Sequence, residues 1–207
     1  SGNPVLVLHA WWGLNDTIQG FCTRLADSGF VAFAPDLYHG KVADDVADAE
    51  RLGSALDANH VQAKAEIAQA ATFLHERAGQ VDRSLAVIGF SLGAYYALDL
   101  SVAEPERIRS VVVFYGTGPD DFGGSRAEYL GHFAEEDPYE PKSYVDALET
   151  ALRDAGRPVS FHIYPGTGHW RETGEGRGVG ATVNLPLPEG CGDAEYACAF
   201  EEVVIPA

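Results

Sequence analysis

The stretch that decides the fold is residues 85–100, which read LAVIGFSLGAYYALDL. Its first four residues are apolar, as in a buried strand, and the residues after Gly93 have the composition of a helix. Between them stands Gly-x-Ser-x-Gly, with the serine at position 91. A strand, a serine flanked by glycines and a helix form a nucleophile elbow, whose sharp turn exposes the serine oxygen. An oxygen placed there faces backbone N–H groups and the positive end of the helix dipole. The pattern therefore predicts that Ser91 is a nucleophile rather than an ordinary turn residue.

The composition is that of a folded and acidic protein. Hydrophobic residues make up 46% of the 207 residues, which is too many for a disordered chain and enough for a substantial core. The net charge of −17 argues against nucleic acid or an anionic membrane as a partner. No apolar run approaches the ~20 residues that span a bilayer, and no signal peptide is visible. We expect a cytoplasmic protein that acts on a small molecule, as a monomer or a homodimer.

The cysteines and histidines follow no metal-binding pattern. Cys22, Cys191 and Cys198 are odd in number and widely spaced, so they suggest neither a disulfide framework nor a zinc site. A reducing cytoplasm is the simplest setting for them. The seven histidines contain no motif such as H-E-x-x-H. We therefore predict no metal and no other cofactor.

Apolar runs alternate with helical patterns over the first 170 residues. This alternation predicts an α/β fold, in which a mostly parallel sheet is covered by helices on both faces. The expected strands are residues 5–8, 30–34, 85–88, 110–115, 129–134 and 158–164. The expected helices are residues 16–28, 43–56, 58–78, 94–104 and 142–155. Glycines then become frequent and the periodicity is lost. We predict one domain over residues 1–170 and an atypical extension over residues 171–207 that is not an independent domain.

A serine hydroxyl needs a general base within hydrogen-bond reach, and the base needs an acid that fixes its tautomer. Both should follow later strands, at the edge of the sheet where parallel strands end. His169 lies in a glycine-rich loop just past the expected strand 158–164, and we predict that it is the base. His162 lies inside that strand and is expected to be a packing residue.

The acid is predicted to be Asp137, which follows the expected strand 129–134. It lies shortly past the end of that strand, and Pro138 stiffens its backbone. The competing carboxylates are Glu135, Glu136, Asp120 and Asp121. An acidic run of this kind is more often a solvated surface, so position in the loop decides the choice.

The loop after the first strand, residues 9–13, is expected to complete the site. The N–H of Leu92, directly after the nucleophile, and the N–H of Trp11 are predicted to hold a negative oxygen. Exposed tandem tryptophans are unfavourable unless they line a pocket, so Trp11 and Trp12 are candidates for a pocket wall. Ordinary core aromatics are the alternative. Tyr38 is assigned to the same predicted pocket.

Five segments in combination resemble the dienelactone hydrolase family, over about residues 3–170. They are VLVLHAWWGLN (5–15), APDLY (34–38), GFSLGA (89–94), GHFAEED (131–137) and YPGTGH (164–169). The resemblance implies an α/β-hydrolase fold, a small hydrolase with little lid, a triad of nucleophile, histidine and aspartate, and no metal. It places this triad on Ser91, Asp137 and His169, in agreement with the inference from the residues.

The chain departs from the family pattern at two related positions. The founding members carry a cysteine in the elbow and a glutamate in the first loop that helps to activate it, whereas this chain has Ser91 and Ala10. A serine activated by His169 does not need that glutamate. The arginines that hold the carboxylate of a dienelactone have no secure match, and Arg51 and Arg171 are the nearby candidates. We therefore expect a carboxylesterase that cleaves a small ester or lactone through an acyl-enzyme intermediate.

From about residue 164 onward, the sequence also resembles a stretch of the histone deacetylase superfamily. The matching pieces are YPGTGHWRETGEG (164–176), TVNLPLP (182–188) and AFEEVV (199–204). The upstream His-His pair and Asp-x-His of the deacetylase zinc site are absent, so we infer no deacetylase chemistry. Residues 193–204 are expected to form a short helix that covers the sheet in place of the usual final helix. The alternative function is a catalytically impaired remnant or binding module with this recombined C-terminus.

Overall fold

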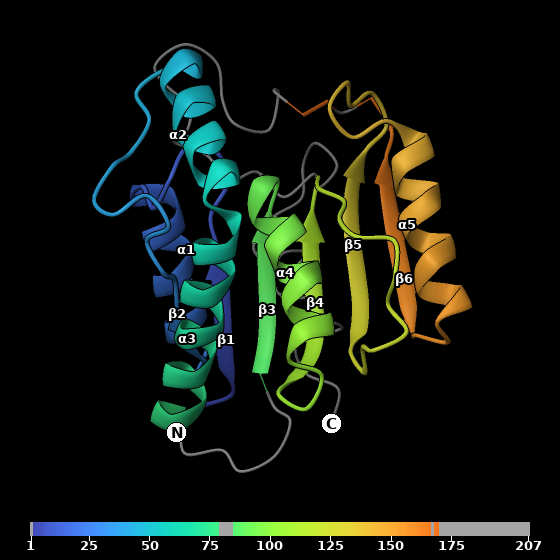
Figure 1. Cartoon of the computed structure of the whole chain (residues 1–207), viewed down its shortest axis with the longest axis horizontal. Helices are drawn as coiled ribbons and strands as arrows, with labels where there is room; N and C mark the ends of the chain where they lie inside the picture. The colour runs from blue at the N-terminus through green and yellow to red at the C-terminus, as the bar shows by residue number, and fades with distance from the viewer. Residues whose placement is uncertain (1, 79–84, 167, 170–207) are drawn as a thin grey trace.

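The computed structural model describes residues 2–78, 85–166 and 168–169, and within these ranges strands and helices alternate (Figure 1). The strands are β1 (Pro4–Leu8), β2 (Val31–Phe33), β3 (Leu85–Phe90), β4 (Ile108–Phe114), β5 (Glu128–Ala134) and β6 (Val159–Tyr164). The helices are α1 (Asp16–Asp27), α2 (Val46–Ala58), α3 (His60–Ala78), α4 (Leu92–Ala103) and α5 (Lys142–Asp154). Each expected strand and helix before residue 165 is therefore present, with ends that differ by a few residues.

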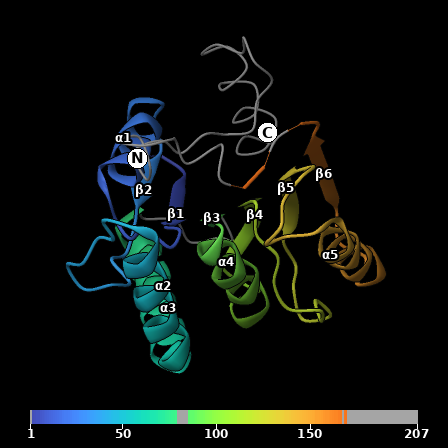
Figure 2. The ribbon, with the colours of Figure 1, turned by 90° about the horizontal axis from the view of Figure 1, so that it is seen from above.

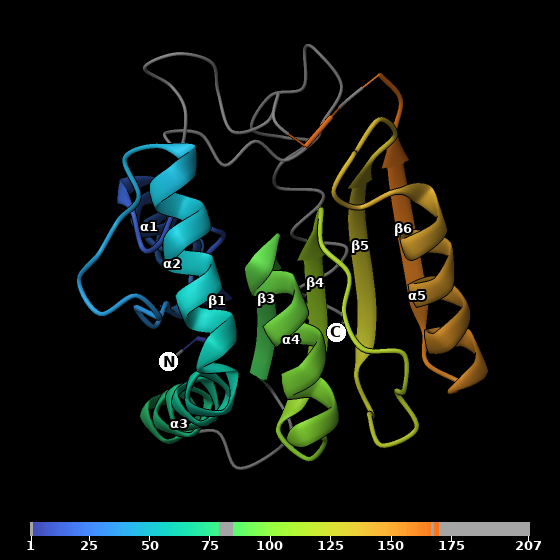
Figure 3. The same ribbon diagram turned by 45° about the horizontal axis from the view of Figure 1, so that its top comes forward.

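The strands form one parallel sheet in the order β2-β1-β3-β4-β5-β6. This arrangement confirms the predicted α/β fold. The arrowheads of β4, β5 and β6 point to the upper edge in Figure 1, and Figure 3 tips this edge toward the reader. The loops that follow the strands meet at this edge, where open parallel sheets place their ligands.

Helices α2, α3, α4 and α5 lie on one face of the sheet, and α1 lies on the other face beside β1 and β2, as the view from above shows (Figure 2). Along β1, Val5 and Val7 belong to the core that includes Phe21 of α1, whereas Leu6 and Leu8 belong to the core formed with α2, α3, α4 and α5. Because β1 is buried on both faces, its side chains form a continuous apolar run instead of an alternating one.

Local signals explain where α1 begins and ends. The side chain of Asn15 caps its N-terminus by accepting a hydrogen bond from the N–H of Ile18 at 3.1 Å. The chain leaves the helix at Gly29, whose φ of +93° is the left-handed conformation that glycine adopts without a steric penalty. Ile18, Phe21 and Leu25 are buried against the sheet on one helical face.

The predicted helix 193–204 of the C-terminal extension lies outside the described residues, and so does the boundary at residue 171. Over the ranges that the structure does describe, none of the helices combines the length and the apolar character that a bilayer span requires.

One buried histidine gives the fold a predictable response to acid. His132 on β5 stands opposite Phe114 on β4 and His162 on β6, and its ring stacks on both, with centroids 4.8 Å and 5.5 Å apart. Its Nδ1 is hydrogen-bonded to Tyr164 Oη at 2.7 Å. Burial and the neighbouring His162 lower the pKa of His132 to about 3. His162, which the sequence predicts to be a packing residue, stacks on this ring but is itself exposed.

We expect this histidine to destabilise the protein in acid. In the unfolded chain, His132 takes up a proton at a pKa of about 6.5. In the folded protein its pKa is about 3. The free energy of unfolding is therefore unaffected by this histidine above about pH 6.5 and decreases as the pH falls below about 6.5. The loss by pH 4 should be on the order of 3 kcal/mol. Urea unfolding of His132→Gln and of the natural protein between pH 7 and 4 tests this. The variant should lose less stability, whereas replacing the exposed His60 by Gln should leave the slope unchanged. Equal slopes for His132→Gln and the natural protein would contradict the expectation.

Candidate active site

Ser91 lies between β3 and α4, in a backbone conformation that few non-glycine residues adopt. Its φ is +48° and its ψ is −114°. Its N–H donates to the carbonyl oxygen of Phe114 at 2.9 Å, and its own carbonyl oxygen accepts from the N–H of Ala94 at 2.8 Å. These bonds hold the strained turn from both sides, which is how such conformations persist at functional sites.

The glycines of the elbow are required by close packing. A Cβ on Gly89 would lie 2.4 Å from the carbonyl oxygen of Gly93, and a Cβ on Gly93 would lie 2.3 Å from the carbonyl oxygen of Leu8. The first turn of α4 therefore rests directly on the end of β1. Gly116, after β4, approaches the same turn, because its Cβ would lie 2.5 Å from the carbonyl oxygen of Ser91.

The structure brings the hydroxyl of Ser91, the imidazole of His169 and the carboxylate of Asp137 into one hydrogen-bonded relay. Ser91 Oγ lies 3.3 Å from His169 Nε2. His169 Nδ1 lies 2.6 Å from Asp137 Oδ2. An ionised carboxylate only accepts hydrogen bonds, so Nδ1 carries the proton and Nε2 presents a lone pair to the serine. This is the arrangement that activates a serine hydroxyl.

Asp137 is held in place by backbone groups of its own turn. Its second oxygen, Oδ1, accepts from the N–H groups of Tyr139 at 2.9 Å and Glu140 at 3.1 Å. Its side chain is 1% exposed. The ring of His169 is also confined, since Tyr115 and Tyr139 contact it with centroids 5.2 Å and 5.1 Å away. Both members of the pair therefore have little freedom to leave the relay.

The competing residues lie elsewhere. His162 is exposed on β6 and stacks on His132. Glu135 accepts from the N–H of Gly166 at 2.9 Å, and Asp121 accepts from the N–H of Gly123 at 2.9 Å, so both fix backbone turns. The other two carboxylates, Glu136 and Asp120, are exposed.

A cavity of about 520 Å³ opens above the relay. It is lined by Ala10, Trp11, Trp12, Asp57, Ser91, Leu92, Tyr95, Tyr115, Thr117, Gly118, Tyr139, Glu140, Tyr144 and His169. The two predicted oxyanion donors, Trp11 and Leu92, therefore line the same cavity as the nucleophile. Leu92 is the first residue of α4, so its N–H has no acceptor within the helix and is available to a ligand.

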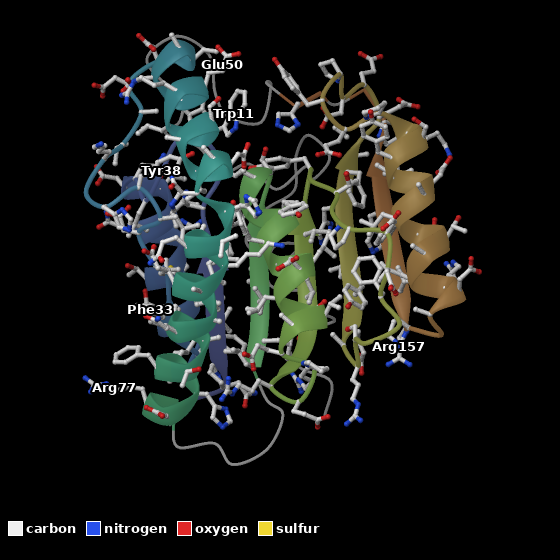
Figure 4. The ribbon with its side chains drawn as sticks, viewed as in Figure 1. Trp11, Phe33, Tyr38, Glu50, Arg77 and Arg157 are labelled. Carbon is white, nitrogen blue, oxygen red and sulfur yellow. The ribbon has the colours of Figure 1, made fainter. Side chains whose placement is uncertain are left out.

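Trp11 and Trp12 both belong to the cavity wall, and Trp12 is also part of the hydrophobic core, so both interpretations apply to Trp12. Trp11 lies beside α2, near the upper edge of the sheet (Figure 4). It contacts Gly53 of α2, where a Cβ would lie 2.7 Å from Trp11 Nε1, and its ring lies 6.4 Å from that of Tyr139. Trp12 is largely buried, at 7% exposure.

The assignment of Tyr38 to the pocket wall requires a correction. The chain turns at His39 and Gly40, which have φ values of +53° and +88°, and the Tyr38 ring enters the core. There it packs edge-on against His9, with centroids 4.9 Å apart. Figure 4 shows Tyr38 below Trp11, toward β2. It supports the loop 9–13 from beneath and does not line the cavity.

His9 is a supporting residue that the sequence analysis missed. Its ring is fully buried at the end of β1, where Nε2 accepts from the N–H of Leu37 at 3.2 Å and Nδ1 donates to the carbonyl oxygen of Ala10 at 2.8 Å. Burial lowers the pKa of His9, which favours the neutral ring that this pattern needs. His9 therefore ties the loop that carries Trp11 to the loop after β2. The sequence signal that points to His9 is a polar residue directly after an apolar strand.

Of the two arginines considered for binding a carboxylate, Arg51 is exposed on α2, pairs with Asp48 and does not line the cavity. Arg171 lies outside the described residues. Among the residues that are described, no group of three or more His, Cys, Asp or Glu side chains is placed to hold a metal ion.

The parallel strand order, the elbow between β3 and α4 and the histidine after β6 define an α/β-hydrolase fold. Comparison with known proteins narrows this class: the chain belongs to the dienelactone hydrolase family, whose model matches residues 2–172. The predicted resemblance is thus confirmed. The crystal structure of the "putative dienelactone hydrolase" of Klebsiella pneumoniae superimposes with a TM-score of 0.69 at 23% identity, covering 81% of this chain and 75% of that one. This similarity supports the assignment of the fold alone.

Among curated proteins, the "putative carboxymethylenebutenolidase" of Aquifex aeolicus is 36% identical over 120 residues. The match covers 56% of this chain and 52% of the relative, so the chain spans about half the length of that protein.

The second resemblance is confirmed as well. The model of the histone deacetylase domain matches residues 158–207, so the two family matches overlap around β6. The chloroplastic histone deacetylase 10 of rice is 57% identical over 44 residues, which are 21% of this chain and 10% of the rice protein.

Proposed function

We propose that this protein is a serine hydrolase that cleaves small carboxylic esters or lactones through an acyl-enzyme intermediate. The relay from Ser91 Oγ through His169 to Asp137, with distances of 3.3 Å and 2.6 Å, is the observation that carries the proposal. Membership of the dienelactone hydrolase family supports hydrolysis. The name of the Aquifex aeolicus relative refers to a butenolide, which is a lactone, and so supports this class of bond.

In the first half of the proposed reaction, Ser91 Oγ attacks the carbonyl carbon while its proton moves to His169 Nε2. Asp137 stabilises the imidazolium that forms. The carbonyl oxygen becomes negative and accepts from the N–H groups of Leu92 and Trp11, at the positive end of α4. His169 then gives its proton to the leaving alcohol oxygen, the carbon–oxygen bond breaks, and the acyl group remains on Ser91.

In the second half, a water molecule takes the place of the alcohol. His169 removes one proton from it, and the resulting hydroxide attacks the acyl carbon. The bond to Ser91 breaks, Ser91 recovers the proton from His169, and the carboxylic acid leaves. Each proton taken up by His169 is therefore returned, and the protein ends unchanged.

The experiment that tests this proposal combines turnover with covalent labelling. We expect the purified protein to hydrolyse p-nitrophenyl butyrate at pH 7.5, and one equivalent of diethyl p-nitrophenyl phosphate to abolish this activity. Peptide mass spectrometry should find a single diethylphosphoryl group, on Ser91. Turnover that survives complete labelling of Ser91 would contradict the proposal. The absence of both turnover and labelling would instead support the impaired remnant or binding module.

A further inference from the structure

The side chains that line the cavity form an unusual combination of aromatic rings and negative charges. Six of them are aromatic, namely Trp11, Trp12, Tyr95, Tyr115, Tyr139 and Tyr144. Two more, Asp57 and Glu140, are carboxylates, whereas none of the described lining residues is a lysine or an arginine. Within the part of the wall that the structure describes, no lysine or arginine side chain compensates the negative charge.

Glu140 belongs to the same turn as the predicted catalytic acid. Its N–H donates to Asp137 Oδ1 at 3.1 Å, and its Oε2 accepts from Thr117 Oγ1 at 2.7 Å. The two bonds direct the carboxylate to the wall of the cavity, close to His169. Burial raises the pKa of Glu140, and the hydrogen bond from Thr117 opposes this effect by stabilising the ionised form. An assay at pH 8 favours the ionised carboxylate further.

Asp57 supplies the second charge from the last turn of α2, a different element of the fold. The lysine of the neighbouring helix α3 is not among the residues that line the cavity. That residue, Lys64, pairs with Asp99 at 2.6 Å, and its ammonium lies 5.6 Å from the centre of the Tyr95 ring. Its charge is therefore paired with Asp99, and it reaches the cavity wall only through its contact with Tyr95.

We infer that the cavity selects esters whose acyl group carries a positive charge and rejects their anionic counterparts. This inference rests on the proposed function and names the substrate class of the same site. Glu140 is half-buried and attracts a cation more strongly than a carboxylate in open water, because its surroundings screen it less, whereas Asp57 is exposed and adds a weaker attraction. Aromatic faces add cation–π attraction, which is largest for quaternary ammonium groups that lose little hydration. The net charge of −17 also attracts cationic substrates and repels anionic ones, at longer range.

Three p-nitrophenyl esters of nearly equal shape provide the test. Their acyl groups are 4-(trimethylammonio)butanoyl, 5,5-dimethylhexanoyl and 4-sulfobutanoyl, which are cationic, neutral and anionic. Because the leaving group is the same, the chemistry is held constant, and each kcat/KM is divided by the rate constant of the same ester with hydroxide. At pH 8 and 20 mM salt we expect the cationic ester to exceed the neutral one about tenfold, and the neutral one to exceed the anionic one by a similar factor.

Glu140→Gln and Asp57→Asn test the source of the selectivity. Each removes one charge with little change of shape, and each should lower the cation-to-anion ratio of kcat/KM about threefold to tenfold. The matched control is Glu76→Gln, which makes the same change in net charge at the exposed far end of α3, next to the Arg77 labelled in Figure 4. The control should leave the ratio unchanged. Raising the salt to 0.5 M should reduce the ratio in the natural protein.

The outcomes separate this inference from the proposed function. If no ester of the series is hydrolysed, the proposed function fails. If the neutral ester is hydrolysed but the cationic ester is not preferred, the inference is overturned while the function stands. The inference is also overturned if Glu140→Gln lowers kcat/KM for all three esters by the same factor, because Glu140 would then only position the turn of Asp137.

Discussion

Replacing Ser91 with alanine is expected to lower kcat for p-nitrophenyl butyrate by about 10⁴-fold or more. The variant keeps the Cβ and the backbone bonds to Phe114 and Ala94 that hold the elbow, so the fold should survive. What it loses is the oxygen that lies 3.3 Å from His169 Nε2. The measurement is steady-state hydrolysis together with the melting temperature, to show that the loss is chemical and not structural.

Ser101 provides a matched control for this variant. It lies on the same helix, α4, and its hydroxyl is buried, where it donates to the carbonyl oxygen of Leu98 at 2.6 Å and shares a hydrogen bond with Tyr129 Oη. Ser101→Ala should therefore cost about 1 kcal/mol of stability and leave kcat within about twofold. Ser91→Ala should instead lose its activity and keep its melting temperature. Substantial turnover by Ser91→Ala would rule out the serine as the nucleophile.

The second large effect is expected for Asp137→Asn, which should lower kcat by about 10⁴-fold. The backbone explains why an isosteric change is so damaging. The N–H groups of Tyr139 and Glu140 both point at Oδ1, so they require an acceptor there and orient the new amide with its oxygen toward them. The amide NH₂ then faces His169 Nδ1, which must accept instead of donate.

The consequence is a histidine in the wrong tautomer. With Nδ1 as the acceptor, the proton of the neutral ring is on Nε2, which can no longer take the proton of Ser91. Nitrogen NMR of the imidazole should show this exchange of roles directly, while the melting temperature stays near that of the natural protein. The neighbouring and exposed Glu136, changed to Gln, is the control and should retain full activity. If Asp137→Asn is nearly silent while Glu136→Gln is crippling, the assignment of the acid is wrong.

The features that could be predicted from the sequence are those with a local signature. The adjacent inner strands β1 and β3 are continuous apolar runs, because a strand buried on both faces does not alternate between apolar and polar residues. The elbow is equally local, because Gly89 and Gly93 are required by contacts within a few residues of Ser91 and with the adjacent strand.

Position in the loop predicts Asp137 rather than Glu136 as the acid, and the structure supplies the physical reason for their difference. A short aspartate side chain can accept from the N–H groups two and three residues ahead, which is how such turns form. Asp137 does so and leaves one oxygen for His169. Its catalytic role remains a prediction for the experiments described above.

Residues whose position depends on distant segments could not be predicted. His9 is fixed by the N–H of Leu37 and Tyr38 by the space beside His9, and neither contact has a sequence signature. The same is true of Asp57 and Glu140, which reach one cavity from α2 and from the turn after β5. Nothing in their local sequence distinguishes them from solvated acidic residues.

The parallel strand order also has a consequence for the time at which the protein becomes active. No neighbouring pair of strands in this sheet is joined by a tight hairpin. The chain between the paired strands β1 and β3 contains α1, β2, α2 and α3. Pairing of this kind brings together segments far apart in the chain and slows folding. The relay draws on the loops after β3, β5 and β6, so it cannot assemble before β6 docks on β5. A chain emerging from the ribosome would therefore acquire its chemistry last, and recovery of hydrolysis during refolding would report completion of the sheet.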